Sequence, residues 1–437
     1  MLMYFRALTI VSFAVAVIFL GCSVSGGQTG VTAAKSSAKT WPIQSVTAEQ
    51  KAMFAAIKRG LLENSRKAPP VLAKSSESYF WIVSSRLQPM INAYEYSGDP
   101  EFLEVFVSVL DAHLKERYRH PTQPKVWSGW WHYAGRGTLY YMPIHGAISY
   151  YIPALKFVRA VRADPKLKAR YGKKAERWFK EITEAEIPAW DKRGCWRDLG
   201  AEGGYYTHVA HYPDAASGKI VDRTDSYGGT TLAYNKVHEL IETFCIAYRL
   251  TGNPWYRDRA EKCERFFRKR WREDDRHVEW NYRDFSGPWD YDPSGETARR
   301  GASNSFKGRK TKTGYFIHPK GGYYARDLHA IVECYNVGIT FTRSDIEKLV
   351  KTNLEFMRMD DTANPTFRKI NGSYTAKGKY GKGYLWTALA QFSPEVRKLW
   401  KARLKGRGYA GTLAYLRAVA DPITWEQKHL REVPKRR

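Results

Sequence analysis

The sequence predicts an all-α protein of helical hairpins, and two adjoining helical segments give the first indication. Between residues 233 and 250 the apolar side chains recur at the spacing of a helix with one buried face. Gly252 follows the last apolar residue, and Asn253 and Pro254 are residue types that favour the N-cap and the first turn of a new helix. The chain is therefore expected to reverse direction here in a tight turn.

The same turn recurs along the chain, which is the second indication. Segment 93–102 matches segment 247–256 position by position, and a looser copy covers 160–167. Such copies predict repeated helical hairpins, and their uneven spacing favours a closed ring over a regular solenoid. The segments between the copies are long and rich in Gly and Trp: 120–143, 190–230 and 272–325. Loops of that length in a compact domain are functional or carry small β-hairpins.

The N-terminus has the pattern of an export signal. Residues 1–21 combine a positive charge at Arg6, an apolar run over 7–20 and small residues at the end. The apolar run is too short to favour a retained transmembrane helix. The four residues that end at Cys22 resemble a bacterial lipobox, so Cys22 is expected to be lipidated. Plain secretion is the alternative.

The rest of the chain divides into a tether and a single working domain. Residues 22–40 are rich in Gly, Ser and Ala and are expected to be flexible. Residues 41–437 are expected to form one catalytic domain. The predicted location is that of an exported protein, either an outer-membrane or periplasmic lipoprotein or a secreted protein, which meets a membrane only through its lipid anchor.

Charge and aromatic content point to the partner. Lys and Arg number 71 against 44 Asp and Glu, for a net charge of +27, and aromatic residues are 14% of the chain, with 15 Trp and 29 Tyr. A positive field attracts polyanions, and flat aromatic faces stack on sugar rings. For an exported protein we expect an acidic polysaccharide rather than nucleic acid. A basic surface that only keeps the protein soluble is the alternative. A monomer is expected.

No motif requires a metal ion or another cofactor. The segment 238–242 begins like a zinc-protease helix, but its fifth residue is Glu rather than His. The cysteines beyond Cys22 form no Cys-x-x-Cys pair, and their spacing determines no disulfide. They are Cys195, Cys245, Cys263 and Cys334.

The turn motif carries a resemblance to a known architecture. Residues 248–256, Tyr-x-x-Thr-Gly-Asn-Pro-x-Tyr, together with the export signal and the aromatic loops, resemble the (α/α) toroids of polysaccharide lyases and of some glycosidases. The alginate-lyase superfamily is most similar, and polysaccharide lyase family 38 within it. The resemblance covers roughly residues 45–405. It implies a complete or incomplete (α/α) barrel that cleaves alginate, glucuronan or a similar polymer by β-elimination.

β-Elimination from a uronate has specific chemical demands. The C5 proton is weakly acidic because the neighbouring carboxylate is negative, so the enzyme must neutralise that carboxylate. A base must then remove the proton, and an acid must protonate the leaving O4. The resemblance implies an Asn and a His as neutralisers, an Arg nearby, and a Tyr as base and acid.

Asn235 and His277 are the predicted neutralisers. Asn235 stands at the start of the helix predicted from residue 233, where it suits a group that faces a cleft. His277 opens the segment 277–285, whose alternation predicts a short strand or loop with His277 and Arg283 on one side. His277 is the candidate neutraliser or base, with His318 and His329 as alternatives.

The stretch 299–315 supplies the predicted tyrosine. It is rich in Lys and Arg without an acidic residue, and it ends at an aromatic patch. Clustered cations favour a phenolate, so Tyr315 is the predicted base and acid, with Arg309 on the substrate carboxylate. Tyr282 and Tyr291 are the alternative tyrosines.

A wider set of aromatic, histidine and arginine residues is expected to bind substrate. Its members are Arg136, Trp130, Trp131, Tyr140, Tyr141, His238, Tyr282, Arg283, His318 and Tyr324. His208 and His211 lie in a further aromatic loop.

Two other functions compete with the lyase. A glycosidase on the same fold needs two carboxylates across a cleft, for which Asp225, Asp290, Asp292, Asp360 and Asp361 are available. A glycan-binding lipoprotein needs only the aromatic platforms. The excess of basic over acidic residues in the candidate loops favours the lyase. The identity of the polymer, endo or exo action and the number of helix pairs stay open.

Overall fold

A computed structural model gives the structure of this protein. It describes residues 46–67, 78–115, 117–129, 131–133, 139–141, 144–213, 217, 219–222, 229–284, 290, 317–318, 320–376, 381–404 and 408–420. All of these belong to the second of the two units into which internal contacts divide the chain, Lys39–Arg437.

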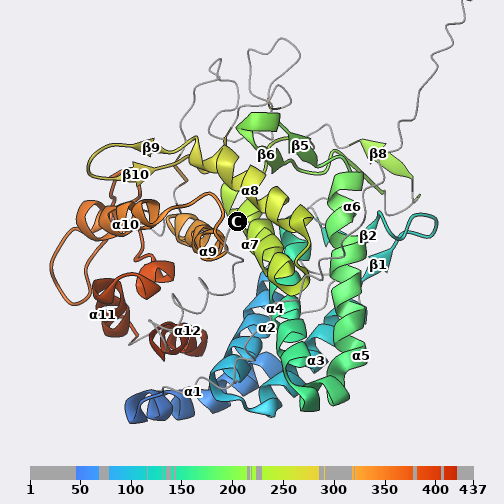
Figure 1. Cartoon of the computed structure of the whole chain (residues 1–437), viewed down its shortest axis with the longest axis horizontal. Helices are drawn as coiled ribbons and strands as arrows, with labels where there is room; N and C mark the ends of the chain where they lie inside the picture. The colour runs from blue at the N-terminus through green and yellow to red at the C-terminus, as the bar shows by residue number, and fades with distance from the viewer. Residues whose placement is uncertain are drawn as a thin grey trace, which may run out of the picture. The chain divides into compact units, whose positions relative to one another are not determined.

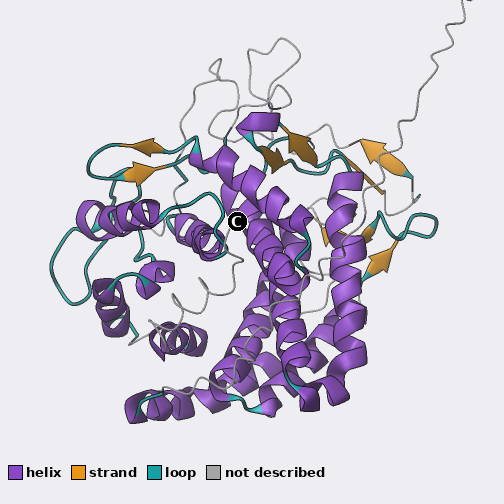
Figure 2. Cartoon of the chain, viewed as in Figure 1, coloured by secondary structure: helices purple, strands orange, loops and turns teal. Residues whose placement is uncertain are grey.

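Helices dominate the described part of this unit, and the sheets found there are two-stranded (Figures 1 and 2). The α-helices are α1 (Ala48–Arg66), α2 (Ser78–Ser97), α3 (Pro100–Lys115), α4 (Ile144–Ala163), α5 (Pro165–Lys180), α6 (Ile187–Lys192), α7 (Tyr234–Thr251), α8 (Pro254–Arg268), α9 (Gly322–Asn336), α10 (Arg343–Lys351), α11 (Pro394–Ala402) and α12 (Tyr409–Ala420). Tighter or wider turns form η2 (Glu181–Glu186), η3 (Gly200–Glu202), η5 (Thr352–Met357) and η6 (Thr387–Gln391).

The described strands pair as antiparallel hairpins, each between neighbours in sequence. They are β1 (Tyr118–Arg119) with β2 (Ser128–Gly129), β3 (Trp131–Tyr133) with β4 (Leu139–Tyr141), β5 (Trp196–Asp198) with β6 (Gly204–Tyr206), β7 (His211–Pro213) with β8 (Ile220–Asp222), and β9 (Arg272–Glu273) with β10 (Val278–Glu279). The expected small β-hairpins in the loops are thus confirmed.

The tight turns form as the sequence predicts. Gly252 takes the left-handed conformation that glycine adopts without strain, at φ 69°, and its N–H bonds the Tyr248 carbonyl. The Asn253 side chain accepts the Trp255 N–H at 3.0 Å, and α8 begins at Pro254. The α4–α5 turn uses Asp164 in the same way, accepting the Lys166 N–H at 2.7 Å. These short connections make each helix antiparallel to the one before it.

The long helices form an inner ring with a partial outer layer. Around the ring α2 packs on α4, α4 on α7, and α7 on α9; η6 and α12 then continue from α9 back to α2. α3, α5 and α8 each pack on the outside of the inner helix that precedes them. The predicted all-α ring of hairpins, an (α/α) toroid, is therefore confirmed.

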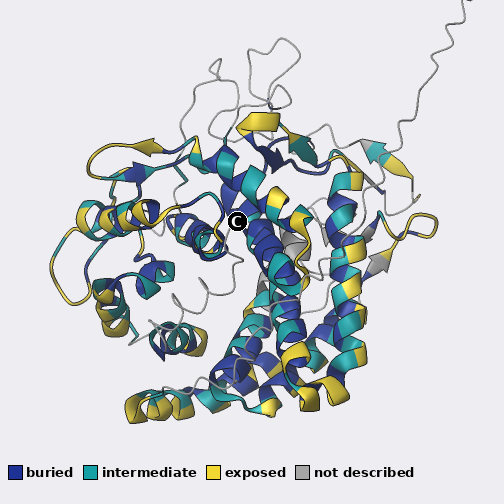
Figure 3. Cartoon of the chain, viewed as in Figure 1, coloured by how far each residue is buried: buried dark blue, intermediate teal, exposed yellow. Residues whose placement is uncertain are grey.

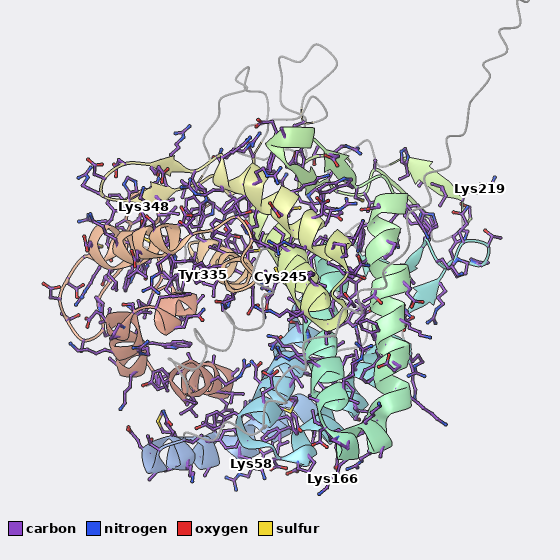
Figure 4. All side chains as sticks on the ribbon, in the orientation of Figure 1. Lys58, Lys166, Lys219, Cys245, Tyr335 and Lys348 are labelled. Carbon is purple, nitrogen blue, oxygen red and sulfur yellow. The ribbon has the colours of Figure 1, made fainter. Side chains whose placement is uncertain are left out.

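Short and long connections lie at opposite ends of the ring. Each inner helix ends in a tight turn, so its outer partner returns the chain to the end where the inner helices begin. The long connections before α4, α7 and α9 consequently share that end. Figure 4 places Lys166, at the start of α5, at the lower edge of the view and Lys219, in the β7–β8 hairpin, in its upper right part. We call these the turn end and the loop end.

Apolar packing holds the layers together. On α7 the predicted apolar face is buried, including Val237, Leu240, Ile241 and Phe244. Figure 3 shows α7 almost wholly buried, whereas the outer helix α5 keeps an exposed side. A single buried cluster runs through the hairpins, and side chains of Leu or Phe size contribute about 1.5–3 kcal/mol each when fully buried.

The inner helices carry polar residues that link neighbouring helices. Lys156 of α4 lies 3.8 Å from Glu242 of α7, and Arg249 of α7 lies 2.8 Å from Glu333 of α9. Such pairs join adjacent inner helices away from the apolar core.

Glu95 of α2 closes the ring in the same manner. It pairs with Arg159 of α4 at 2.7 Å and with Arg417 of α12. Arg417 also donates to Asn92 at 2.7 Å. Although burial opposes it, the guanidinium groups of Arg417 and Arg159 hold the pKa of Glu95 below its usual value.

The four cysteines in the described part are buried thiols. Cys245 of α7 and Cys334 of α9 meet at the helix interface, with their sulfur atoms 3.5 Å apart. Figure 4 shows Cys245 near Tyr335 in the middle of the molecule. The described helices include none with the length and apolar content that crossing a bilayer needs.

The segment from His277 onward forms the short strand and loop that its alternation predicts. Only Val278 and Glu279 pair with a partner strand, because β9 itself has only two residues. Beyond Glu279 the chain turns inward and buries Trp280. The predicted alternation holds as far as Asn281, because Val278 and Trp280 are buried between partly exposed neighbours, whereas Arg283 is itself buried and does not share their side.

We expect the ring to depend on Glu95. In Glu95→Gln the two guanidinium groups lose their shared carboxylate at a buried position, so the free energy of unfolding should fall by about 2–3 kcal/mol. This expected loss in the free energy of unfolding is smaller than for a fully buried ion pair, because Arg159 and Arg417 are partly exposed. Urea unfolding followed by circular dichroism measures it.

Glu104→Gln is the matched control in the same hairpin. Its partner Arg170 is 2.9 Å away and both side chains are about half exposed, so the loss should stay under about 1 kcal/mol. Equal losses in the two variants would show that Glu95 does not close the ring.

Candidate active site

The loop end of α7 presents Asn235. The N-cap of α7 is Ala233, which has no capping side chain, so Asn235 lies in the first helical turn rather than at the cap. It is 2% exposed, and its Oδ1 has no hydrogen-bond partner among the described residues. A buried amide oxygen without a partner is costly unless a ligand or water satisfies it. The Tyr234 N–H donates to the Tyr282 carbonyl at 3.0 Å and ties the next loop to this turn.

A cluster of three rings lies where that loop meets the start of α9. The centroids of Tyr282 and His318 are 4.5 Å apart, those of Tyr282 and Tyr323 are 5.4 Å apart, and those of His318 and Tyr323 are 4.6 Å apart. Lys320 lies over Tyr323, with its Nζ 3.5 Å from the phenol oxygen. We call Tyr282, His318 and Tyr323 the ring cluster.

His318 is held in its neutral form. Burial and the nearby charges of Lys320, Arg283 and Lys369 lower its pKa to about 4. Its Nδ1 accepts the Lys320 N–H at 3.0 Å, so in the neutral ring the proton is on Nε2. The Tyr324 hydroxyl accepts the His318 N–H at 2.9 Å and fixes the backbone. His318 therefore presents an N–H donor in a cationic environment.

His238 lies beneath the start of α7 rather than at its surface. It is 1% exposed, with Nδ1 2.8 Å from Asp327 Oδ1 and Nε2 3.5 Å from Glu264 Oε2. Although burial opposes it, the two carboxylates raise its pKa to about 10. Trp280 donates to the second oxygen of Asp327 at 2.9 Å. His238, predicted as a substrate-binding residue, is thus a buried cation that joins α7, α8 and α9.

One turn beyond Asn235, Glu239 is a buried carboxyl group. It is 4% exposed and pairs with Arg326 of α9. Burial raises its pKa to about 7 even though Arg326 opposes the shift. His329 follows on α9; it keeps contact with solvent, yet burial and Arg326 lower its pKa to about 4.

Other predicted residues take different positions. His277 sits in the β9–β10 turn, with Nδ1 3.0 Å from Asp274 Oδ1 and its ring stacked on Phe356 at 3.8 Å. These partners belong to the hairpin and to η5 rather than to the start of α7. Arg283 is buried, and its charge reaches His318. Tyr324 is buried and supports His318 from behind.

The remaining predicted site residues lie outside the described part of the chain or have side chains outside it. For Trp131, in β3, and for Tyr140 and Tyr141, in β4, the structure describes the backbone and not the side chain. Those outside altogether are Tyr315, Arg309, Tyr291, Trp130 and Arg136, together with the export signal and Cys22.

Of the aspartates considered for a glycosidase, Asp290 has a structural role. It is fully buried and accepts the Thr231 N–H at 2.8 Å and the Thr231 hydroxyl at 2.6 Å. Asp360 accepts the Thr366 N–H at 2.9 Å within a turn, and Asp361 beside it is exposed. Asp225 and Asp292 lie outside the described residues. His208 is buried and its N–H donates to the Thr230 carbonyl at 2.7 Å, while His211 is exposed in β7.

Sequence reasoning gave no role to Lys320 or to Glu239. A sequence signal for Glu239 existed, because residues 235, 239 and 242 are polar at helical spacing along α7. Lys320 gave no such signal, since its importance comes from the fold that brings His318 and Tyr282 to it. No group of three or more His, Cys, Asp or Glu in the described part is placed to hold a metal ion.

Comparisons with known proteins find similarity in the backbone alone. No family model matches the sequence, and no curated protein is significantly similar to it. Among solved structures, a GH76 α-mannanase from Bacteroides thetaiotaomicron has 11% identity and a TM-score of 0.36, over 78% of this chain and 69% of its own.

Two further structures are similar to a comparable degree. An inactive variant of an α-1,6-mannanase of family GH76 from Salegentibacter sp., bound to α-1,6-mannotriose, has 10% identity and a TM-score of 0.42, over 86% of this chain and 99% of its own. A polysaccharide lyase has 11% identity and a TM-score of 0.32, over 83% of this chain and 75% of its own. Identity and TM-score are both too low to assign an activity.

We expect His238 to make stability depend on pH in the alkaline range. Its pKa is about 10 in the folded protein against an ordinary value of 6.5. The stabilisation by its charged form is complete below the ordinary value and is lost as the pH rises through about 10. The free energy of unfolding from urea titrations should therefore fall as the pH rises from neutral toward about 10, and His238→Asn should lower it at neutral pH and flatten that slope.

His113→Asn is the matched control. Burial lowers the pKa of His113 to about 3, so this side chain is neutral throughout the alkaline range. An alkaline slope that both variants leave unchanged would contradict a charged His238.

Proposed function

We propose that this protein is a carbohydrate-active enzyme, a polysaccharide lyase that cleaves an acidic, uronate-containing polysaccharide such as alginate or glucuronan by β-elimination. The observation that carries the proposal is the ring cluster at the loop end, where tyrosines and a neutral histidine lie beside Lys320 and the Tyr282 carbonyl is bound to the turn of α7 that carries Asn235. These are the groups that β-elimination from a uronate requires.

Electrostatics favour an anionic substrate at this site. The chain carries a net charge of +27, which attracts polyanions over long range. Arg283, Lys320 and Lys369 lie close enough to His318 to lower its pKa. The loop end is also where α7 and α9 begin, so their helix dipoles add positive potential.

In the proposed mechanism the substrate carboxylate is neutralised first. The Nε2–H of neutral His318 and the side-chain amide of Asn235 donate hydrogen bonds to it, and Arg283 supplies positive charge. Charge builds on this carboxylate as the C5 proton leaves, so donors held in place stabilise the transition state more than the ground state.

A tyrosine then moves the proton. Among the described tyrosines we favour Tyr282, because it contacts His318 and its own carbonyl is bound to the first turn of α7. As phenolate it takes the C5 proton, and as phenol it returns a proton to O4 when the C4–O4 bond breaks. One residue can do both when the C5 proton and O4 lie on the same face of the sugar. Tyr315, paired with Arg309, is the tyrosine that the sequence predicts for this role.

We also propose that the enzyme is exported and works outside the cytoplasm, anchored through Cys22. The support is the charged and apolar pattern of residues 1–21 and the lipobox-like residues before Cys22. An extracytoplasmic location would bring the enzyme to polymers too large to enter the cell.

We expect purified protein comprising residues 40–437 to produce unsaturated ends from a uronate polymer. The substrates are alginate, polymannuronate, polyguluronate, glucuronan, pectate and glycosaminoglycans, and the readout is the ultraviolet absorbance of the new C4–C5 double bond. Tyr282→Phe should lower kcat by roughly 10²–10⁴-fold, because it removes the proton-transfer group. Asn235→Ala should lower it by roughly 10²–10³-fold, because it removes a donor to the carboxylate.

Tyr335→Phe is the matched control, since this tyrosine packs on Phe392 at the other end of α9 and should keep full activity. Tyr315→Phe and His277→Ala are measured beside it. If Tyr315→Phe is inactive and Tyr282→Phe is not, the catalytic tyrosine is Tyr315. If no polymer gives the absorbance, the lyase proposal fails.

A second candidate, a glycoside hydrolase, is favoured by one observation. Glu239 is a buried carboxyl group whose pKa is raised to about 7, as a general acid for glycoside cleavage requires. Glu242 lies one turn further along α7, and burial raises its pKa as well. These two residues, rather than the aspartates considered from sequence, are the described carboxyl groups best suited to that chemistry.

The two functions predict different outcomes for Glu239. A hydrolase should release reducing ends without ultraviolet absorbance, and its activity should fall as the pH rises above about 7 because the acid form is lost. Glu239→Gln should then lose roughly 10²–10⁴-fold in kcat. Glu333→Gln, on α9 in the pair with Arg249, is the matched control. Retained hydrolysis in Glu239→Gln would exclude Glu239 as the acid.

A further inference from the structure

Tyr384 is one of the exposed large side chains of the described residues, yet its backbone is rigidly held. Its ring is 40% exposed. Asn353, fully buried in η5, donates from Nδ2 to the Tyr384 carbonyl at 3.0 Å and accepts the Trp386 N–H at 2.9 Å. The segment is therefore fixed from beneath while the ring faces solvent. A rigid aromatic ring binds a ligand with little loss of side-chain entropy.

Close packing places this ring beside the ring cluster. A Cβ built on Gly321 would lie 3.2 Å from Tyr384 Cδ2, and one on Gly322 would lie 3.9 Å from Tyr384 Cε2. These glycines directly follow Lys320 and directly precede Tyr323. A Cβ on Gly321 would also come within 2.8 Å of the Lys382 carbonyl, so only glycine permits this approach.

The loop that carries Tyr384 also brings positive charge to the site. Gly383 donates to the Phe367 carbonyl at 2.8 Å, and Thr375 donates to the Gly381 carbonyl at 3.0 Å, so residues 381–383 lie against residues 367–375. Lys369 belongs to this loop, and its charge contributes to the low pKa of His318. An exposed ring and an ammonium group thus occupy one loop next to the ring cluster.

We propose that Tyr384 and Lys369 form a neighbouring sugar subsite. Tyr384 stacks on the apolar face of a uronate ring adjacent to the one being cleaved, and Lys369 binds a carboxylate of the same chain. This inference rests on the proposed lyase function. It adds the residues that would bind the substrate chain next to the bond that is cleaved. An acidic oligosaccharide suits the subsite because it offers a flat ring face and a carboxylate on every unit, as a neutral glycan does not.

The first test compares KM and kcat on the best polymer found in the absorbance scan. Tyr384→Ala should raise KM by roughly tenfold, which corresponds to about 1.4 kcal/mol of lost binding. Its kcat should change little, because the residue does not touch the reacting atoms. Tyr384→Phe should match the native enzyme, since stacking needs the ring and not the hydroxyl. Lys369→Met should raise KM and weaken its salt dependence.

Tyr409→Ala is the matched control, because Tyr409 is equally exposed, at 44%, and lies against Gly60 of α1. An unchanged KM in Tyr384→Ala, or a loss in Tyr384→Phe as large as in Tyr384→Ala, would overturn the subsite. An equal rise in Tyr409→Ala would also overturn it.

Direct binding measurements test the subsite proposal separately from the proposal that the protein is a lyase. Isothermal titration with a tetrasaccharide of mannuronate and one of glucuronate is carried out on Tyr282→Phe with and without Tyr384→Ala, and with mannotetraose as the neutral probe. Weaker acidic-oligosaccharide binding in the double variant supports the subsite even if no elimination is found. Binding of neither acidic probe, or equal binding in both proteins, rejects it.

Discussion

The buried carboxylate of Asp327 holds together the elements that form the loop end. Its two oxygens hold His238 of α7 at 2.8 Å and the indole of Trp280 at 2.9 Å, while His238 also approaches Glu264 of α8 at 3.5 Å. One buried ionic group therefore joins three helices and the segment that leads to Tyr282. An anion at this depth is costly without partners, so α7, α9 and the Trp280 segment are held in one arrangement. That arrangement positions the first turn of α7 beside the ring cluster.

The contrast between His238 and His318 shows how position sets chemistry. Both are partly or wholly buried, and burial alone disfavours the charged form of each. His238 faces two carboxylates and is charged, whereas His318 faces cations and is neutral. The first can only support the structure, because no solvent reaches it. The second keeps an N–H donor in a positive environment, which suits recognition of a carboxylate.

The ring geometry explains why function gathers at one end. The turns at residues 98–100, 163–165 and 251–254 are short, so they bring few side chains to the turn end. The connections before α4, α7 and α9 are long and share the loop end, so residues distant in sequence meet there. Polar side chains on the inner helices pair across adjacent helices.

The sequence by itself determined the hairpins. Helical spacing and the Gly-Asn-Pro turn set α7 and α8 to within a residue, because caps and turns depend on neighbours in the chain. It also predicts Asn235, Tyr282, Arg283 and His318 as site residues, and this stays a prediction. Only the tertiary structure decided that His238 is a buried cation, that His277 contacts Asp274 and Phe356, that Glu239 pairs with Arg326, and that Tyr384 packs beside Gly321. The physical reason is that charge state and proximity arise from groups far apart in the chain, which local patterns do not encode.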